Sequence, residues 1–207
     1  MNVVFDFGAV LFTWRPVDLI AETFPERAAT PAQAGHLAHA VFSHADWQGF
    51  DRGVLAMDTV IERTARRLDL NAKSLGALVE SIGDRLTPID TTVALLEQLH
   101  AQASVRLYFL SNMPLPYARV LEQRHGFLKR FQGGIFSGDV LLIKPEAAIY
   151  QLLQTRYALE PAQTVFIDDL LGNVEAAQAQ GWQGIHFKSA QQATQELQAL
   201  GLSKIGC

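Results

Sequence analysis

The stretch VVFDFGAVL, residues 3–11, lies near the N-terminus as a short apolar run that an acid and a glycine interrupt. The β-branched and aromatic residues from Val3 to Phe7 are typical of a strand, because such side chains pack well on a pleated surface. Asp6 stands where this strand ends, and Gly8 leaves open backbone beside it. A carboxylate in that position either caps a turn or projects into a crevice as a nucleophile toward phosphorus.

Four further runs of the same kind occur later in the chain: Val105–Leu110, Gly134–Phe136, Thr164–Ile167 and Gly184–Phe187. Segments with a helical period separate them or follow them: Thr91–Gln102, Pro116–His125, Pro145–Arg156, Asn173–Gln180 and Ala190–Leu200. Alternation of strand and helix predicts the α/β class, with a parallel sheet that helices cover on both faces.

The segment from about Trp14 to about Leu86 has a different pattern. It carries helical periods at residues 31–42, 57–68 and 75–82, and it contains no convincing strand. We therefore expect a helical insertion between the first strand and the rest of the sheet.

Composition limits the class of protein. The 207 residues are 49% hydrophobic, which is enough for one compact domain or a core with one modest insertion. A formal charge of -4 offers no basic footprint for nucleic acid. No segment approaches the roughly 18 apolar residues of a membrane span. The single Cys207 excludes an internal disulfide, and Asp6 ends the first apolar run too early for a secretory leader, so we expect a cytoplasmic protein.

Polar residues also follow the later predicted strands. Ser111 and Asn112 end the second strand, Asp168 and Asp169 end the fourth, and Lys144 precedes a proline that suits a first helical turn. Alone, each has an ordinary explanation as a turn, a helix N-cap or a surface charge. Together they lie at one rim of the sheet, where acids hold Mg²⁺ and the other groups meet a phosphate. Their joint order predicts a phosphate and cation site.

Four segments in this order resemble the motifs of the haloacid dehalogenase superfamily. They are residues 3–11, residues 110–112, residues 143–145 with Ile149 and Tyr150, and residues 165–169 with Asn173, Ala176 and Ala177. The resemblance implies a Rossmann-like parallel sheet flanked by helices, formed by residues 1–13 and 87–207. It further implies an inserted α-helical cap subdomain at residues 14–86, in agreement with the helical periods found there.

The resemblance also implies a role for each rim residue. Asp6 is the expected nucleophile, and Lys144 is the expected catalytic cation. The expected Mg²⁺ ligands are the Asp6 carboxylate, the backbone carbonyl of Gly8, Asp168 and Asp169, and within the last pair Asp169 is favoured as the direct ligand while the choice stays open. The expected phosphate contacts are Ser111, Asn112 and Lys144. The cations would neutralise the phosphate so that an anionic nucleophile can approach it.

The superfamily contains phosphatases and dehalogenases. A haloacid brings only a carboxylate and needs no divalent ion, and Asp168 and Asp169 would repel it unless a cation lay between them. The acid pair therefore favours a phosphatase, and its spacing to Asn173 resembles the branch similar to glucose-1-phosphatase. We expect Mg²⁺-dependent hydrolysis of a small phosphorylated metabolite, a sugar phosphate, through an aspartyl-phosphate on Asp6.

Gly8 departs from the pattern of most of these phosphatases. They carry at this position a second acid that protonates the leaving alcohol, a contribution of about 10²–10⁴-fold in rate. The sequence does not identify its replacement, although a polar stretch of the insertion holds candidates: His44, Asp46, Trp47, Asp51 and Arg52. Of these we predict that His44 and Trp47 contribute to specificity, against the alternative that His44 is a surface residue and Trp47 belongs to the cap core.

Two other functions stay open. One is a metal-independent 2-haloacid dehalogenase, which uses the same nucleophile on carbon. The other is a non-catalytic protein that binds a phosphate ester but lost turnover with the acid at position 8. The expected partner in each case is a small molecule. The apolar pair Leu170 and Leu171 either lies under the cap or belongs to an interface, and oligomeric state is open.

Overall fold

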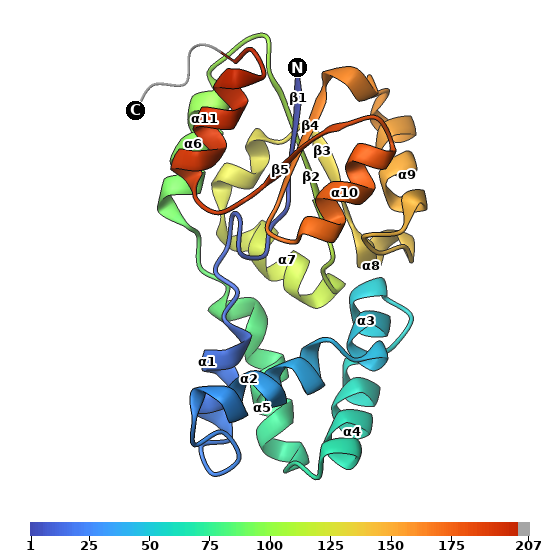
Figure 1. Cartoon of the computed structure of the whole chain (residues 1–207). Helices are drawn as coiled ribbons and strands as arrows, with labels where there is room; N and C mark the ends of the chain where they lie inside the picture. The colour runs from blue at the N-terminus through green and yellow to red at the C-terminus, as the bar shows by residue number, and fades with distance from the viewer. Residues whose placement is uncertain (203–207) are drawn as a thin grey trace.

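The computed structural model describes residues 1–202, so Cys207 lies outside the described residues. Figure 1 shows a sheet of five parallel strands in the order β3-β2-β1-β4-β5. The strands are β1 (Asn2–Phe5), β2 (Arg106–Ser111), β3 (Gly133–Phe136), β4 (Thr164–Asp168) and β5 (Gln183–His186). Because β1 is central and pairs with both β2 and β4, the ends of these three strands meet at the middle of one edge.

The two faces of the sheet are covered by different helices. Alternate side chains of β1 point to opposite faces, so Val3 and Phe5 belong to one core cluster and Val4 to another. The first face is covered by α6 (Asp90–His100) and α11 (Ala190–Ala199), and the second by α9 (Ala147–Tyr157) and α10 (Leu171–Ala179). These helices and strands match the predicted α/β class.

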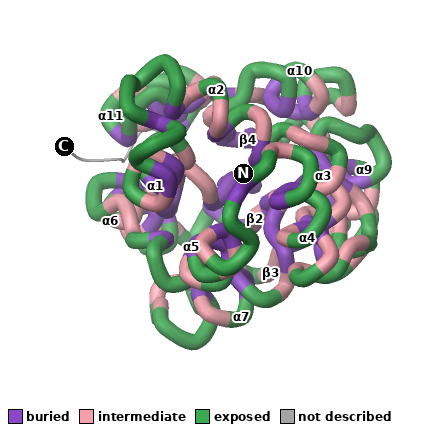
Figure 2. The backbone as a smooth tube through the Cα atoms, turned by 90° about the horizontal axis from the view of Figure 1, so that it is seen from below, coloured by how far each residue is buried: buried purple, intermediate pink, exposed green. Residues whose placement is uncertain are grey.

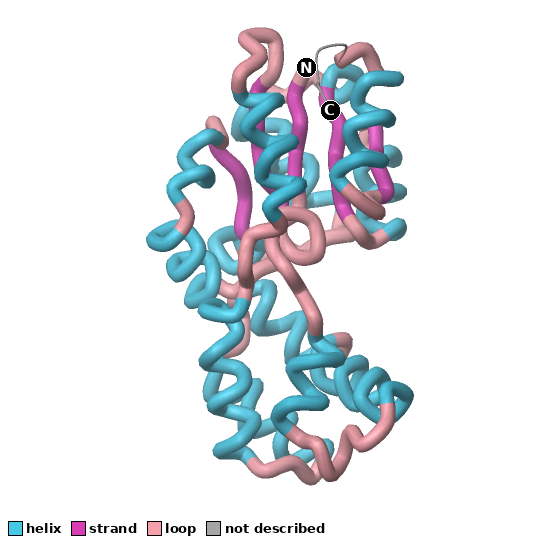
Figure 3. Tube along the Cα trace, turned by 90° about the vertical axis from the view of Figure 1, so that its left-hand side faces the viewer, coloured by secondary structure: helices cyan, strands magenta, loops and turns pink. Residues whose placement is uncertain are grey.

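Helices α1 to α5 form a separate helical body beyond the carboxyl ends of the strands, as Figures 1 and 3 show. They are α1 (Pro16–Thr23), α2 (Pro31–Phe42), α3 (Ala45–Arg52), α4 (Met57–Leu68) and α5 (Ala72–Arg85). Where the chain leaves and re-enters the core, the amide of Thr13 donates to the carbonyl of Thr87 and their hydroxyls lie 2.9 Å apart. The predicted helical insertion is therefore present, and the exact domain division at residues 13/14 and 86/87 stays a prediction.

The remaining elements belong to the core, and two of them contact the insertion. They are α7 (Leu115–Arg124), η1 (Gly126–Arg130), α8 (Ser137–Val140) and η2 (Pro161–Gln163). Helix α7 packs against α5, and α8 packs against α3, so the insertion contacts the core on two sides. Figure 2, viewed from below, shows the buried backbone in the interior and the exposed backbone on the outer helices and loops.

Two details of the sequence prediction were wrong. The stretch with His44 and Trp47 lies between the predicted helices at residues 31–42 and 57–68 and was assigned no helix of its own. It forms α3, which the His44 imidazole caps by accepting a hydrogen bond from the amide of Asp46. A helix was also predicted to begin at Pro145, whereas α9 begins at Ala147. The hydrophobic period identifies long helices better than one of 8 residues. No helix among residues 1–202 is long and apolar enough to cross a membrane.

Candidate active site

The turn after β1 holds Asp6 at the edge of the sheet. The amide of Asp6 donates to the carbonyl of Ile167 on β4, which extends the pairing of the strands by one residue. Phe7 then turns its ring into an aromatic cluster, with its centroid 5.0 Å from that of Phe109 and 5.2 Å from that of Phe136. Because Phe7 is fully buried, this packing fixes the backbone from which the Asp6 side chain projects into a cavity.

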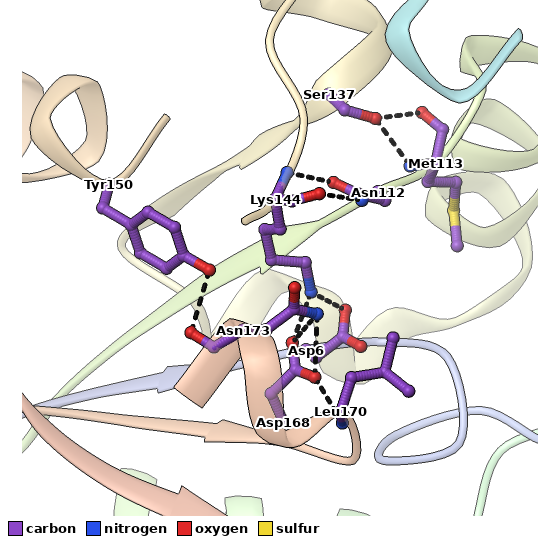
Figure 4. Close-up of polar contacts among 9 residues, drawn as sticks. All are labelled: Asp6, Asn112, Met113, Ser137, Lys144, Tyr150, Asp168, Leu170 and Asn173. Carbon is purple, nitrogen blue, oxygen red and sulfur yellow. Dashed lines mark hydrogen bonds and ion pairs between the residues drawn. The ribbon is translucent and has the colours of Figure 1, made fainter. Parts of the chain in front are cut away.

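Lys144 lies between two of the predicted carboxylates, as Figure 4 shows. Its ammonium Nζ is 2.8 Å from Oδ1 of Asp6 and 2.6 Å from Oδ2 of Asp168. The Lys144 side chain is 1% exposed, so both contacts form in a place that water hardly reaches. A charge pair of this kind is costly to bury and needs further hydrogen bonds to hold its geometry.

Asp168 receives those further hydrogen bonds. Nδ2 of Asn173 donates to both oxygens of Asp168 at 3.0 Å, and the amide of Leu170 donates to Oδ1 at 2.8 Å. The hydroxyl of Tyr150 in turn donates to the carbonyl of Asn173 at 2.9 Å. Asp168 therefore has its oxygens occupied by protein donors, and Tyr150 is a supporting residue to which sequence reasoning gave no role.

Asn112 holds the backbone of Lys144. Its Oδ1 accepts from the Lys144 amide at 2.8 Å, and its Nδ2 donates to the Lys144 carbonyl at 3.0 Å. The predicted contact between Asn112 and a phosphate would compete with this pairing, because both amide groups are used. Ser111 is 1% exposed and lines the cavity, and no hydrogen bond to its hydroxyl is found within residues 1–202.

The carboxyl groups are hard to ionise together. Burial raises the pKa of Asp6 to about 7, with the Lys144 ammonium opposing and the neighbouring carboxylates reinforcing the shift. Burial and the Asp168 carboxylate raise the pKa of Asp169 to about 6. Burial also lowers the pKa of Lys144, but Asp168 and Asp6 outweigh it, so this pKa lies above its ordinary value. The positive charge of one ammonium therefore does not fully neutralise the negative charges of the acids, and a second cation would neutralise the remainder.

The three acids fit a divalent cation. Asp6, Asp168 and Asp169 each offer a carboxylate oxygen, and these oxygens lie within 4.8 Å of one another. Carboxylates in such a group suit Mg²⁺, which binds through one or two of them and keeps several waters. Within residues 1–202, no other side chain donates to the Asp169 carboxylate, in contrast to Asp168. Gly8 lines the same cavity, where its backbone is accessible.

A cavity of about 480 Å³ joins this rim to the insertion. The rim contributes six of the seven predicted rim residues: Asp6, Gly8, Ser111, Asn112, Lys144 and Asp169. The seventh, Asp168, is fully buried and is not among the lining residues. Its wall beyond the rim is mostly apolar and comes from the insertion and the facing loops: Trp14, Pro16, Val17, Ala38, Phe42, Trp47, Ile82, Leu86, Met113, Pro114, Tyr117 and Leu170. The insertion adds the polar side chains of His39, Ser43 and Asp51.

The structure separates the two predicted specificity residues. Trp47 is buried, lines the cavity, and packs edge-on against Phe42 with centroids 4.7 Å apart. His44 is not among the residues that line the cavity, since its imidazole faces the amide and carboxylate of Asp46 at the start of α3. Asp46 pairs with Arg63 at 3.2 Å and is likewise not among the lining residues.

Comparison with protein families finds a match that covers most of the chain. A model of the haloacid dehalogenase-like hydrolases matches residues 2–181, a range that includes strands β1 to β4 and the helical insertion. The chain is also similar to a sesquiterpene phosphatase, astK, of Aspergillus oryzae. The two are 28% identical over 204 residues, which cover 99% of this chain and 96% of that protein.

Solved structures share the fold at lower identity. The HAD family enzyme bt-2542 of Bacteroides thetaiotaomicron, solved with magnesium and inorganic phosphate, is 18% identical with a TM-score of 0.66, covering 90% of this chain and 93% of that one. The L-2-haloacid dehalogenase of Xanthobacter autotrophicus is 20% identical with a TM-score of 0.65, covering 100% of this chain and 84% of that one. The branch similar to glucose-1-phosphatase is not singled out by these matches.

Proposed function

Since the chain belongs to the haloacid dehalogenase-like hydrolases, we propose that it is a Mg²⁺-dependent phosphatase that acts through an aspartyl-phosphate on Asp6. The observation that carries the proposal is the buried Lys144 ammonium within 2.8 Å of Asp6, beside two further acids. A site for a haloacid, which is a monoanion, has no need of three clustered carboxylates. A phosphate ester is a dianion, and it needs the positive charge that this cluster gathers.

Each residue of the rim has a task in this proposal. An oxygen of Asp6 attacks phosphorus, and the bond from phosphorus to the ester oxygen breaks in line with that attack. Lys144 donates to a phosphate oxygen and stabilises the charge of the transition state, with Ser111 as a further donor. Mg²⁺, held by Asp6, Asp169 and the Gly8 carbonyl, would neutralise the phosphate and the carboxylates together. Water then releases phosphate from Asp6.

Asp169 is the side chain whose loss tests the metal site. We expect Asp169→Asn to abolish the rise in melting temperature that Mg²⁺ gives the wild-type protein, because the variant lacks the carboxylate to which no other side chain within residues 1–202 donates. Differential scanning fluorimetry with 0 to about 10 mM MgCl₂ measures this directly, since ligand binding stabilises a folded protein by mass action. Asp84→Asn, which alters an exposed pair with Arg124, is the matched control. An unchanged response in Asp169→Asn would contradict the ligand assignment.

The wall of the cavity bears on the substrate class. Beyond the rim it offers mainly Trp14, Phe42, Trp47, Met113 and Leu170, and few donors or acceptors for sugar hydroxyls. Polar groups bound against such a wall would lose their hydrogen bonds to water. We propose a phosphate ester of an apolar alcohol as the substrate in preference to a sugar phosphate. The sesquiterpene phosphatase among its relatives supports the same choice.

A substrate panel tests both the reaction and this choice. We expect kcat/KM for farnesyl phosphate to exceed that for glucose 1-phosphate by roughly tenfold or more, because burial of each methylene contributes about 0.8 kcal/mol. Both reactions are expected to stop in excess EDTA. The measurement is phosphate release at equal enzyme concentrations, with 4-nitrophenyl phosphate as a general substrate. A preference for glucose 1-phosphate would support the sugar-phosphate prediction instead.

The same panel separates the rival functions. Halide release from 2-chloropropionate that persists in EDTA would support the dehalogenase. Tight binding of phosphate esters without turnover would support the non-catalytic binding protein. Either result would overturn the proposed phosphatase.

A further inference from the structure

The proposed reaction needs a proton for the departing alcohol, and Gly8 has no side chain to give one. The acid that replaces it must lie in the cavity and face the rim. Five titratable side chains besides Lys144 line the cavity within the described residues: Asp6, His39, Asp51, Tyr117 and Asp169. Asp6 and Asp169 already belong to the nucleophile and metal cluster, which leaves one carboxyl group, an imidazole and a phenol.

We propose that Asp51, on helix α3 of the insertion, is the catalytic acid that protonates the leaving alcohol and the base that then activates water. The proposal rests on the phosphatase function argued above and adds to it the missing partner of Asp6. It has three requirements. Helix α3 must be held in contact with the core beside the rim, and the Asp51 carboxyl group must not be engaged by another protein group. That carboxyl group must also carry a proton near neutral pH.

The backbone of Asp51 on α3 is hydrogen-bonded to the core. The hydroxyl of Ser137 donates to the carbonyl of Asp51, and the Ser137 hydroxyl oxygen accepts from the amide of Met113 at 2.8 Å. Met113 directly follows Ser111 and Asn112 at the end of β2, and Figure 4 shows its contact with Ser137 close to the site. Ser137 therefore connects the backbone of Asp51 to the rim through a single side chain.

The next two residues add further contacts with the core. Both terminal nitrogens of the Arg52 guanidinium contact the carboxylate of Glu146, two residues after Lys144. Gly53 ends α3 with a φ of +83° and lies so close to α8 that a Cβ there would be 2.7 Å from the carbonyl oxygen of Gly138. These contacts hold the end of α3 against the core, so Asp51 is held beside the rim.

The carboxyl of Asp51 is available for chemistry. No hydrogen bond or ion pair to its oxygens is found within residues 1–202, and the ammonium of Lys144 is near enough to affect its charge. Burial raises the pKa of Asp51 well above its usual range, and Lys144 opposes this only in part. The last turn of α3 adds the negative end of a helix, which also disfavours a carboxylate. The nearby phenol of Tyr117 stays neutral, because burial raises its pKa above its ordinary value.

The other two candidates are less suited. The phenol of Tyr117 already donates its proton to the carbonyl of Val79 at 2.7 Å. His39 is exposed on α2, and within residues 1–202 no hydrogen bond or ion pair joins its ring to the core. Asp51 is the one carboxyl group of the insertion that lines the cavity in the described part of the chain.

The proposed steps balance. Asp6 attacks phosphorus, the ester bond breaks, and the leaving oxygen takes the proton of Asp51, so that an alcohol, an aspartyl-phosphate and the Asp51 carboxylate result. The Asp51 carboxylate then takes a proton from water while the water oxygen attacks phosphorus. The bond from Asp6 to phosphorus breaks, which restores the Asp6 carboxylate and the protonated Asp51 and releases inorganic phosphate.

The test compares leaving groups of different basicity in Asp51→Asn. We expect kcat/KM for farnesyl phosphate to fall by roughly 10²–10³-fold, while kcat/KM for 4-nitrophenyl phosphate falls less than about fivefold, since 4-nitrophenolate leaves without a proton. The ratio kcat/KM is the right measure because it reports ester cleavage and not the later attack by water. Asp46→Asn, on the same helix but paired with Arg63, should leave both values unchanged.

A second variant tests the role of Asp51 even if Asp51→Asn changes the structure of α3. Apart from its two chain neighbours, the atom nearest to an ideal Cβ on Gly8 is Cβ of Trp14, at 3.9 Å, so the Cβ of Gly8→Asp meets no clash. We expect Gly8→Asp combined with Asp51→Asn to recover at least about tenfold of the loss on farnesyl phosphate. Equal losses on both esters, no loss on either, or no recovery would each overturn the assignment of Asp51. A wild-type protein inactive on both esters would instead overturn the phosphatase function itself.

Discussion

Asp6→Asn is expected to lower kcat/KM for every phosphate ester by about 10⁴-fold or more, because the amide oxygen is a poor nucleophile. The loss should be the same for 4-nitrophenyl and farnesyl esters, unlike the selective loss expected for Asp51→Asn. The direct measurement is transfer of ³²P from a labelled ester to the denatured protein, which the wild type should show after a rapid quench and the variant should not. Wild-type turnover in Asp6→Asn would remove Asp6 as the nucleophile.

The stability of the same variant serves as its folding control, and its sign follows from the raised pKa. The folded protein keeps a proton on Asp6 up to about pH 7, whereas the unfolded chain releases it near 3.8. The free energy of unfolding therefore falls as pH rises across this window, and the full cost is present above pH 7. Asp6→Asn lacks the ionisable carboxyl group and does not bear this cost, so in EDTA at pH 8 its melting temperature should exceed that of wild type by roughly 10 °C. The difference should vanish near pH 4.

The rim residues were predictable because their positions follow from topology. In a parallel sheet, residues that end neighbouring strands meet at one edge, so Asp6, Ser111 and Asp168 come together wherever β1, β2 and β4 are adjacent. The residue type then limits the chemistry, since carboxylates beside a lysine suit a phosphate and a cation. Lys144 follows no strand, but its proximity to Asp6 agrees with the role expected from the motif order.

The insertion could not be predicted in the same detail. Helices α2 and α4 have the bounds that their periods predict, but α3 is short and polar, and the sequence analysis assigned no helix to it. Whether His44 or Asp51 faces the cavity depends on how α3 docks against α8, which rests on the contact between Gly53 and Gly138 and on Ser137. Such contacts join segments more than 80 residues apart, and no local pattern in the sequence reports them.

The role of Asn112 shows a second limit. Its position after β2 correctly predicts that it lies at the rim. However, the nitrogen and the oxygen of its side-chain amide are both hydrogen-bonded to the backbone of Lys144. The position in the sequence predicts where the backbone of Asn112 lies in the sheet. Whether its side chain binds a ligand or a protein group depends on the conformation of the loop that contains Lys144. The structure therefore favours Asn112 as a residue that positions Lys144.

Lys144→Met is expected to damage both folding and chemistry, because it removes the one cation among three acids. Loss of one partner from a buried ion pair typically costs about 3–5 kcal/mol, so in EDTA at pH 8 the melting temperature should fall by roughly 10 °C. The fall should be smaller at pH 5, where Asp6 is protonated in the folded protein and needs no partner. Turnover with saturating Mg²⁺ should fall by about 10³-fold, since a donor to the transferring phosphate is lost.

The matched control for this prediction is Lys129→Met, which removes an exposed lysine of η1 and should change neither the melting temperature nor the turnover. The pH dependence distinguishes charge from packing, because a cavity or a misfit at position 144 would destabilise the protein equally at pH 5 and pH 8. If the loss of stability were the same at both pH values, the electrostatic account of Lys144 would fail. If it were smaller at pH 5 while turnover stayed low, Lys144 would serve both to bring the acids together and to bind phosphate.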